Sequence, residues 1–403
     1  MSRSDLYVDS FSNALAACSI DLVVSGSIGA VESVRFIRAL RRIGASPKVW
    51  LTKGGSQFVT NTALAWASAQ PIIENFTGDA SHIALGDACV VAPASASIIG
   101  KIAQGLTDTP ASALIASYLG QKKPVILIPN MNDSLIDSPF VQENLQRLRK
   151  FCHVLGARVE EGKQKFPDPA ELADEVAQLI NQGQRAHVLI SMGTTRGYID
   201  DVRYISNYSS GALGSKISEE LYRQGFQTTV VSGPCPIKPR VATKLIPIET
   251  NQELEKACLN ALQSGADAAI LAASVLDFAP LKKQSGKISS KEDLAVEFVK
   301  TEKIIGKLHP RSGIKIGFKL EAQLDSVRAR AIAEDYFARY QLQMMVLNAL
   351  SELNEQEHRA FVVSKSQYSG SDLQMQVVDG KQEIALAITE FLKLNYNPQK
   401  HAT

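Results

Sequence analysis

The stretch that decides the fold is Gly193–Gly211, GTTRGYIDDVRYISNYSSG, between a short apolar strand and a predicted helix. The strand covers Val188–Ser191, and the helix begins near Ala212. A loop of small residues, hydroxyls, one amide and two arginines at this place suits phosphate and carboxylate groups, because backbone N–H groups at a helix N-terminus attract anions. The stretch also divides the chain into two halves, each patterned as a nucleotide-binding unit.

Length and composition predict two ordinary domains in the cytoplasm. The chain has 403 residues, 45% of them hydrophobic, and a net charge of +2, which gives no case for nucleic acid. Its five cysteines include no CxxC pair, which argues against a zinc site or disulfide framework and suits a reducing compartment. No apolar run approaches the roughly 18–20 residues of a membrane span, and the N-terminus lacks a signal-peptide pattern.

Both halves alternate apolar strands with helical patterns, which is typical of a parallel sheet covered on both faces. The predicted strands of the first half are Leu22–Val24, Val49–Leu51, Ala88–Ala92 and Val125–Ile128, and its helices include Ile28–Leu40, Gln57–Ala67 and Ala170–Ile180. The second half has predicted strands Val188–Ser191, Thr228–Val231, Ala268–Ala272, Ile314–Phe318 and Met344–Leu347, and predicted helices Glu321–Tyr340 and Glu383–Leu394. The fold class that follows is α/β, with two doubly wound, mainly parallel, Rossmann-like domains in tandem, residues 1–183 and 184–403.

Small, hydroxyl-rich turns follow two strands of the first half, at Ser25–Gly29 and Pro93–Ser97, and Pro129–Asn132 adds amides after a third strand. Strands of one parallel sheet bring such turns to the same edge. Two such turns favour one phosphorylated ligand, although each alone also reads as an ordinary tight turn. His82 is the histidine near these turns, and a lone histidine is more often structural than catalytic.

These motifs resemble the flavin-dependent cysteine decarboxylases, specifically the phosphopantothenoylcysteine decarboxylase family. The family pattern of a glycine-rich turn, HI-LA, PASAN and PxMN corresponds to Gly26–Ala30, His82–Leu85, Pro93–Ser97 and Pro129–Asn132. The resemblance implies an FMN site formed by the turns that carry Gly26, Ser27, Ile28 and Ser95. It also implies that His82 and Asn132 contact the substrate carboxylate and amide.

The first half departs from this family at three places. Ser97 stands where PASAN has asparagine, and Leu135-Ile136 replaces the tryptophan region of PxMNxxMW. The clamp motif ACGExGxGRM is missing from His153–Phe166, so the cysteine expected to return a proton to the enethiol is absent. Cys152 precedes this position and is predicted to be a buried side chain, and the decarboxylase half is therefore impaired, altered in outcome or only structural.

The second half places polar groups before a helix and after further strands. A phosphate can be held by Ser209 and Ser210 just before the helix, where backbone N–H groups are free. Arg203 and Asn207 lie upstream of them, and Gly211 is at the helix start. Small residues in Ala272–Phe278, including Ala273 and Ser274, let a planar base lie against the backbone. Asp277 can take ribose hydroxyls or a metal, or simply cap a helix. Lys287, in the predicted mobile flap Leu281–Asp293, can neutralise a polyphosphate or be a solvated side chain.

This half resembles the phosphopantothenate–cysteine ligase family. The motifs GGTREPIDPVRYISNxSSG, VSGP, AAAVADY, KIKK, GFAAET and VAND correspond in order to Gly193–Gly211, Val231–Pro234, Ala272–Phe278, Lys287–Ser290, Gly317–Glu321 and Val346–Ala349. The resemblance implies activation of the 4′-phosphopantothenate carboxylate as an acyl-cytidylate, followed by attack of the cysteine amine. It implies contacts of Asn207 with the acyl-cytidylate, of Lys287 with the triphosphate, and a nucleotide pocket lined by Ala273, Asp277 and Phe318. Mg²⁺ would bridge the phosphates.

Departures here leave the choice between CTP and ATP open, since Lys319-Leu320-Glu321 is closer to the FKLET variant of ATP-using ligases. The leading interpretation is a fused coenzyme A biosynthesis protein with CTP favoured. A second keeps the ligase and makes the first half a flavin-binding or assembly module, and a third is a catalytically silent nucleotide-binding regulatory protein. The resemblance further implies homo-oligomers, with ligase dimers and flavoprotein trimers combining into a dodecamer.

Overall fold

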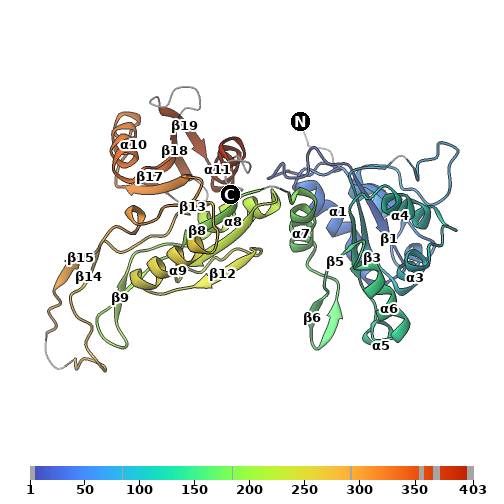
Figure 1. The fold of residues 1–403 in the computed structure, drawn as a ribbon, viewed down its shortest axis with the longest axis horizontal. Coiled ribbons are helices and arrows are strands. Elements are labelled where there is room, and N and C mark those ends of the chain that lie inside the picture. Colours follow the sequence, from blue (N-terminus) through green and yellow to red (C-terminus); the bar gives the residue numbers. More distant parts are fainter. Residues whose placement is uncertain are drawn as a thin grey trace. The chain divides into compact units, whose positions relative to one another are not determined.

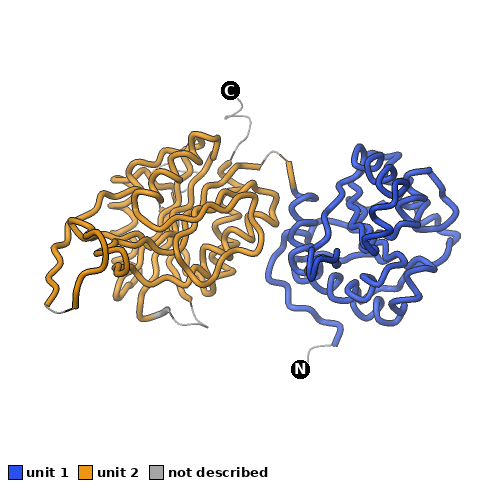
Figure 2. The backbone as a smooth tube through the Cα atoms, turned by 90° about the horizontal axis from the view of Figure 1, so that it is seen from below, with its two compact units in different colours: residues 1–181 blue, residues 182–403 orange. Residues whose placement is uncertain are grey.

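The computed structural model describes residues 5–83, 85–183, 185–290, 293–353, 358–365 and 373–396. The chain forms two compact units, unit 1 with residues 1–181 and unit 2 with residues 182–403 (Figure 2). Each unit contains its own main sheet, and each is described here by itself.

Unit 1 is built on a five-stranded parallel sheet with the strand order β2-β1-β3-β4-β5 (Figure 1). The strands are β1 (Ile20–Val24), β2 (Lys48–Leu51), β3 (Ala88–Ala94), β4 (Val125–Pro129) and β5 (His153–Val154). The helices are α1 (Ser33–Arg42), α2 (Asn61–Ser68), α3 (Ala96–Gln104), α4 (Pro110–Gly120), α5 (Asp133–Ile136), α6 (Pro139–Leu148) and α7 (Pro169–Asn181). A separate hairpin, β6 (Arg158–Glu160) and β7 (Lys163–Lys165), projects from this unit.

Strand β1 of unit 1 is buried on both faces. Leu22 and Val24 pack in a core shared with α1, α2 and α7, whereas Val23 packs in a second core with α3, α4 and α6. Side chains that enter a core on either face of a strand are mostly apolar, as Leu22–Val24 are, whereas the buried Asp21 of the same strand accepts hydrogen bonds from Trp50, Gly86 and Tyr118. This is why an uninterrupted apolar run, and not an alternating pattern, marks the strand in the sequence.

Unit 2 contains an eight-stranded sheet with the order β12-β11-β8-β13-β16-β17-β18-β19. Its strands are β8 (His187–Met192), β11 (Gln227–Ser232), β12 (Lys244–Pro247), β13 (Ala268–Leu271), β16 (Lys315–Glu321), β17 (Met344–Leu353), β18 (His358–Lys365) and β19 (Leu373–Asp379). The helices are α8 (Ala212–Arg223), α9 (Asn251–Gln263), α10 (Ser326–Tyr340) and α11 (Lys381–Asn395). The strands from β12 to β17 are parallel, and β18 and β19 are antiparallel additions at one edge.

Helices cover both faces of this second sheet. Val188 and Ile190 pack in a core with α8 and α11, and Leu189, between them, packs in another core with α9. A third core joins α10 to β17 and β18. The prediction of two doubly wound, mainly parallel α/β sheets is confirmed, while the two antiparallel strands at the edge of unit 2 were not predicted.

An arm extends from unit 2 beyond its main sheet (Figure 1). It consists of two short antiparallel pairs, β9 (Arg196–Tyr198) with β10 (Tyr204–Ser206), and β14 (Phe278–Pro280) with β15 (Phe298–Lys300). β9 and β14 lie side by side. The arm thus joins the loop after β8 to the loop after β13, which are the two loops that carry most of the predicted site residues.

Candidate functional sites

In unit 1, the turns after β1 and β3 meet through their serines. The Ser25 hydroxyl donates to the Pro93 carbonyl at 2.7 Å, and the Ser95 backbone N–H donates to Ser25 Oγ at 2.9 Å. The two hydroxyls are 3.1 Å apart. Ser95 also begins α3 as its N-cap. The two small-residue turns predicted from sequence therefore form one polar rim at the carboxyl edge of the sheet.

Asn130 completes this rim from the end of β4. Its buried Oδ1 accepts hydrogen bonds from Ser27 Oγ at 2.6 Å and from the Gly29 N–H at 3.2 Å. A Cβ at Gly29 would lie 2.3 Å from this oxygen, so only glycine fits there. An acceptor oxygen thus sits between a hydroxyl and an N–H beside the first turn, which are donors that also suit a phosphate oxygen.

The other predicted residues of this rim have different surroundings. Gly26 lies against Gly54, whose backbone would be 3.0 Å from an added Cβ, and the side chain of Ile28 is 69% exposed. Asn132 caps α5, where its Oδ1 accepts from the Ser134 N–H at 3.0 Å. Asn132 therefore serves a local helix in this structure, and Asn130 is the amide that joins the rim.

His82 lies in the long loop before β3, with its ring edge-on to Phe76 at a centroid distance of 5.3 Å. Within the described part of unit 1, no hydrogen bond connects His82 to the serine rim. The end of its loop is fixed by buried Asp21, which accepts from the Gly86 N–H at 3.3 Å and the Tyr118 hydroxyl at 2.6 Å. The loop that carries His82 is thus anchored, although the structure does not join His82 to Asn132.

The β6–β7 hairpin takes the place of the clamp motif. Its turn uses Glu161 and Gly162, both with positive φ, and its first strand carries the exposed ion pair Arg158–Glu160 at 2.9 Å. Cys152, before β5, is buried, and this burial raises its thiol pKa to about 11. The prediction that Cys152 is a buried side chain is confirmed, and it offers no exposed thiol to this hairpin.

In unit 2, the loop after β8 is joined directly to the loop after β13. Thr194 and Ser274 form a β-bridge, and Thr195 Oγ1 accepts from the Leu276 N–H at 3.0 Å. The Asn207 side chain donates to the Val275 carbonyl at 3.0 Å. Asn207 thus reaches the segment that carries Ala273, Ser274 and Asp277, as a shared nucleotide site requires.

The start of α8 has the form of an anion site. Ser209 Oγ accepts from the Gly211 N–H at 3.3 Å, and Ser210 Oγ accepts from the Ala212 N–H at 3.4 Å. Gly211 has φ +79°, and a Cβ there would lie 2.3 Å from the Ile237 carbonyl oxygen. Two hydroxyls therefore lie beside the first N–H groups of a twelve-residue helix.

Asp277 pairs with a lysine that sequence reasoning missed. Lys303, just before a short 3₁₀ turn, forms an ion pair with the Asp277 carboxylate. Burial alone would lower the pKa of the Lys303 ammonium. The hydrogen bond and the negative charge of Asp277 act in the opposite direction, and the pKa is raised. Phe318 is half-buried on β16, one position beyond the Leu271–Gly317 pairing with β13, so it lies at the same sheet edge. An ion-pair partner 26 residues away leaves no local signal in the sequence.

Arg203 lies in the arm, where its guanidinium donates to Asp200 Oδ2 at 2.6 Å and to the Ile288 carbonyl at 3.1 Å. Burial would raise the pKa of Asp200, but the N–H groups of Arg203, Val202 and Ile288 and the Arg203 guanidinium hold it well below its usual range. The predicted contact of Arg203 with a substrate phosphate remains a prediction. Lys287, next to Ile288, is exposed and has no hydrogen bond or ion pair with any residue that the structure describes.

Two further features bear on the chemistry. Within the described ranges, no three His, Cys, Asp or Glu side chains gather where they could hold a metal ion. No helix in these ranges has the length and apolar character that crossing a bilayer requires.

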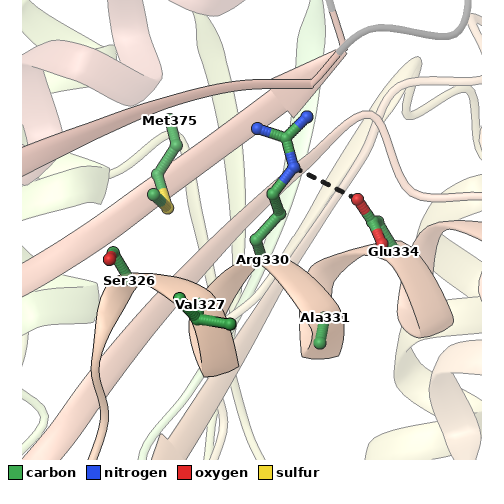
Figure 3. A pocket seen from close by; sticks show the side chains of 6 residues that line it. All are labelled: Ser326, Val327, Arg330, Ala331, Glu334 and Met375. Carbon is green, nitrogen blue, oxygen red and sulfur yellow. Dashed lines mark hydrogen bonds and ion pairs between the residues drawn. The ribbon is translucent and has the colours of Figure 1, made fainter.

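A hollow of about 370 Å³ between α10 and β19 is lined by Ser326, Val327, Arg330, Ala331, Glu334 and Met375 (Figure 3). None of the predicted site residues lines it, and its Arg330 and Glu334 pair with each other at 3.2 Å.

Comparison with known families agrees with this division. Residues 10–181 match the model of the Flavoprotein family, and residues 183–394 match that of the DNA/pantothenate metabolism flavoprotein C-terminal domain. The coenzyme A biosynthesis bifunctional protein CoaBC of Thermococcus kodakarensis is 31% identical over 369 residues, covering 88% of this chain and 91% of that protein. The chain belongs to the CoaBC family.

One relative of this CoaBC family member carries a different name. A cysteine/cysteine sulfinic acid decarboxylase from an unknown prokaryotic organism is 30% identical over 341 residues, which is 76% of this chain and 92% of that protein. A solved DNA/pantothenate metabolism flavoprotein from Streptococcus pneumoniae is 25% identical, with a TM-score of 0.47, and covers 52% of this chain and 100% of that one. The predicted family, fusing a flavoprotein domain with a ligase-type domain, is confirmed.

Proposed function

We propose that this CoaBC family member acts in coenzyme A biosynthesis, where unit 2 joins cysteine to 4′-phosphopantothenate with a nucleoside triphosphate. The observation that carries the proposal is the Asn207–Val275 hydrogen bond of 3.0 Å, which ties the phosphate-type loop before α8 to the segment of Asp277. A ligand spanning both loops would meet a helix N-terminus at one end and a carboxylate beside small residues at the other. A phosphorylated acid joined to a nucleotide has these features.

The reaction begins when the carboxylate of 4′-phosphopantothenate attacks the α-phosphate of CTP, or of ATP, and pyrophosphate leaves. In this proposal Ser209, Ser210 and Gly211 hold the substrate phosphate at the start of α8. Lys287 brings a positive charge to the leaving pyrophosphate, where negative charge develops. Asp277 receives the ribose hydroxyls, with Ala273, Ser274 and Phe318 lining the nucleotide pocket.

The second step forms the amide. The cysteine amine attacks the acyl carbon of the mixed anhydride, and the nucleoside monophosphate leaves with the electron pair of the acyl–oxygen bond. Asn207 contributes an amide that can orient the acyl group for this attack. The described residues form no cluster that could hold a metal ion, and Mg²⁺ bound with the nucleotide would neutralise part of its phosphate charge.

Unit 1 is proposed to hold FMN at the rim of Ser27, Ser95 and Gly26, with Ile28 beside it. The rim suits the phosphate of FMN, because hydroxyl and N–H donors converge on an acceptor oxygen at Asn130. Bound FMN would supply the oxidation chemistry of cysteine decarboxylation. His82 and Asn132 would contact the carboxylate and amide of the substrate.

Pyrophosphate release tests the ligase directly. Purified protein should release pyrophosphate only when 4′-phosphopantothenate and either CTP or ATP are present, and cysteine should then yield the amide product. Comparing the two nucleotides at equal concentration decides which one is used. Absence of release with both nucleotides would refute the ligase, and would leave the silent nucleotide-binding protein as the better account.

Decarboxylation is tested separately with 4′-phosphopantothenoylcysteine. We predict slow or absent formation of 4′-phosphopantetheine, because the β6–β7 hairpin carries no cysteine and Cys152 is buried. Yellow protein that releases no carbon dioxide would favour a flavin-binding module. Rapid formation of 4′-phosphopantetheine would contradict the prediction and show that another group supplies the proton.

A further inference from the structure

The backbone around Lys287 is tied to the Asp200–Arg203 turn by several hydrogen bonds. Gln284 N–H donates to the Ile199 carbonyl at 2.9 Å, and the Lys283 ammonium pairs with Asp201 Oδ1 at 2.7 Å. These contacts join two segments more than 80 residues apart in the sequence. A lysine- and glycine-rich segment of this kind predicts a freely moving flap, but here its backbone has fixed partners.

Both neighbours of Lys287 are held through both of their backbone polar groups. Gly286 donates its N–H to Asp201 Oδ2 at 2.7 Å and accepts from the Asp201 N–H at 3.1 Å. Ile288 donates its N–H to Asp200 Oδ2 at 3.0 Å and accepts from Arg203 Nη1 at 3.1 Å. Lys287 therefore sits at the centre of a four-bond clasp while its own side chain stays exposed.

The base of this clasp is stiff. Asp200 is fully buried, and its second oxygen accepts from the Val202 and Arg203 N–H groups at 2.8 and 2.6 Å. On the same arm, the Arg196 guanidinium lies 4.3 Å from the Tyr204 ring centre, and Tyr204 packs edge-on against Tyr198. Ring–ring and cation–ring contacts of this kind restrict the strands that carry the turn.

We propose that Asp200, Asp201 and Arg203 are positioning residues that fix the place from which Lys287 reaches the triphosphate. This inference rests on the proposed ligase function of unit 2. A flexible lysine loop loses backbone freedom when it closes on a ligand, whereas a clasped loop has already lost it before the ligand arrives. The charges beside the segment include Asp200, Asp201, Arg203 and Lys283, which form two ion pairs, whereas Lys287, like Lys282, has no ion pair with any residue that the structure describes.

Hydrogen exchange of the intact chain tests the clasp without any turnover. In Asp200→Asn, the amide oxygen can keep the Val202 and Arg203 N–H bonds, but the amide NH₂ then faces the Ile288 N–H, a second donor. We expect exchange in the 284–290 segment to become at least about tenfold faster. Asp335→Asn is the matched control, since Asp335 forms an exposed ion pair with Arg339 at 2.8 Å on α10, and it should leave this segment unchanged.

A second variant guards against misfolding of the first. Asp201→Ala removes the acceptor of the Gly286 N–H from a half-exposed position, so the fold should tolerate it, and exchange at Gly286 should rise. Unchanged exchange in both variants would overturn the clasp. This result is independent of catalysis, so it decides the clasp even if the wild-type protein releases no pyrophosphate, an outcome that would refute only the ligase.

Kinetics test whether the clasp acts through Lys287. Asp200→Asn should raise the KM for the nucleotide about tenfold, with a smaller change in kcat. Lys287→Gln should lower kcat/KM strongly in the wild type, but by less than about threefold in the Asp200→Asn background, because residues acting through one contact are not additive. Fully additive losses would show that Asp200 acts independently of Lys287, and would overturn the positioning role.

Discussion

Replacing Gly29 by alanine should disrupt the polar rim of unit 1. The new Cβ would lie 2.3 Å from Asn130 Oδ1 and 2.9 Å from Asn130 Cγ, both far inside contact distance. Asn130 must therefore move, and its hydrogen bonds from Ser27 and from the N–H of residue 29 are lost or stretched.

The cost follows from two contributions. Overpacking a buried site typically destabilises by about 1–3 kcal/mol. Each hydrogen bond lost adds about 0.5–1.5 kcal/mol. We expect about 2–6 kcal/mol in all, which corresponds to a Tm lower by about 4–24 °C for a domain of this size. The flavin should also be retained less well, because the rim that would hold its phosphate is displaced.

Thermal unfolding followed by visible flavin absorbance, together with the flavin-to-protein ratio after purification, measures both effects. Gly100→Ala is the matched control. Gly100 lies inside α3, where an added Cβ would meet only Asn144 Nδ2, at 3.8 Å. Alanine is the better helix former by about 0.5–1 kcal/mol, so this variant should be slightly more stable. Equal Tm and flavin content in Gly29→Ala and the wild type would refute the reasoning.

Three further predictions concern unit 2. Lys287→Gln should slow ligation by about 10–100-fold, the worth of one charged hydrogen bond, with unchanged Tm, and unchanged turnover would remove this lysine from the mechanism. Arg223→Met should destabilise the unit by about 3–5 kcal/mol in urea unfolding, because it leaves the buried Glu219 and Glu220 without the guanidinium that pairs with them at 3.2 and 3.3 Å; a midpoint equal to the wild type would contradict this. Burial lowers the pKa of His358 to about 4, so between about pH 6.5 and pH 4 the unfolded chain binds a proton that the folded chain does not. This contribution to stability is complete above pH 6.5 and is lost as the pH falls, so His358→Gln should flatten the pH dependence of unfolding in that range, and an equally steep profile would contradict the assignment.

Most of the parallel strands could be predicted because they are buried on both faces, whereas the largely exposed edge strands β5 and β12 were missed. Val188, Leu189 and Ile190 all enter cores, so they leave a continuous apolar run. β19, at the sheet edge, was missed because half-buried and exposed positions largely alternate along it, and β18 was missed although Ala360–Val363 form a buried apolar run. The strands of the arm were missed because each has only three residues, which is too short to show an alternating pattern.

The site could be predicted in part for the same reason. Ser27, Ser95 and Asn207 lie on turns after strands, and the topology of a parallel sheet brings such turns together. Asn130 lies in the predicted turn Pro129–Asn132. The resemblance to the decarboxylase family gave the substrate-binding role to Asn132, and the contact of Asn130 with Ser27 was not predicted. The clasp around Lys287 could not be predicted from the sequence, because backbone groups form most of its hydrogen bonds. The lysine, serine and glycine composition of this segment indicates only a polar loop.

The most direct test of the central claim follows the oxygen atoms of the substrate. 4′-Phosphopantothenate labelled with heavy oxygen in its carboxylate should transfer one labelled oxygen to CMP or AMP during ligation, because the carboxylate attacks the α-phosphate and the acyl–oxygen bond later breaks. Mass spectrometry of the released nucleotide measures this transfer. Label found in the nucleoside monophosphate is the predicted result. Labelled inorganic phosphate together with unlabelled CDP or ADP would show attack at the terminal phosphate, and would contradict the acyl-nucleotide mechanism.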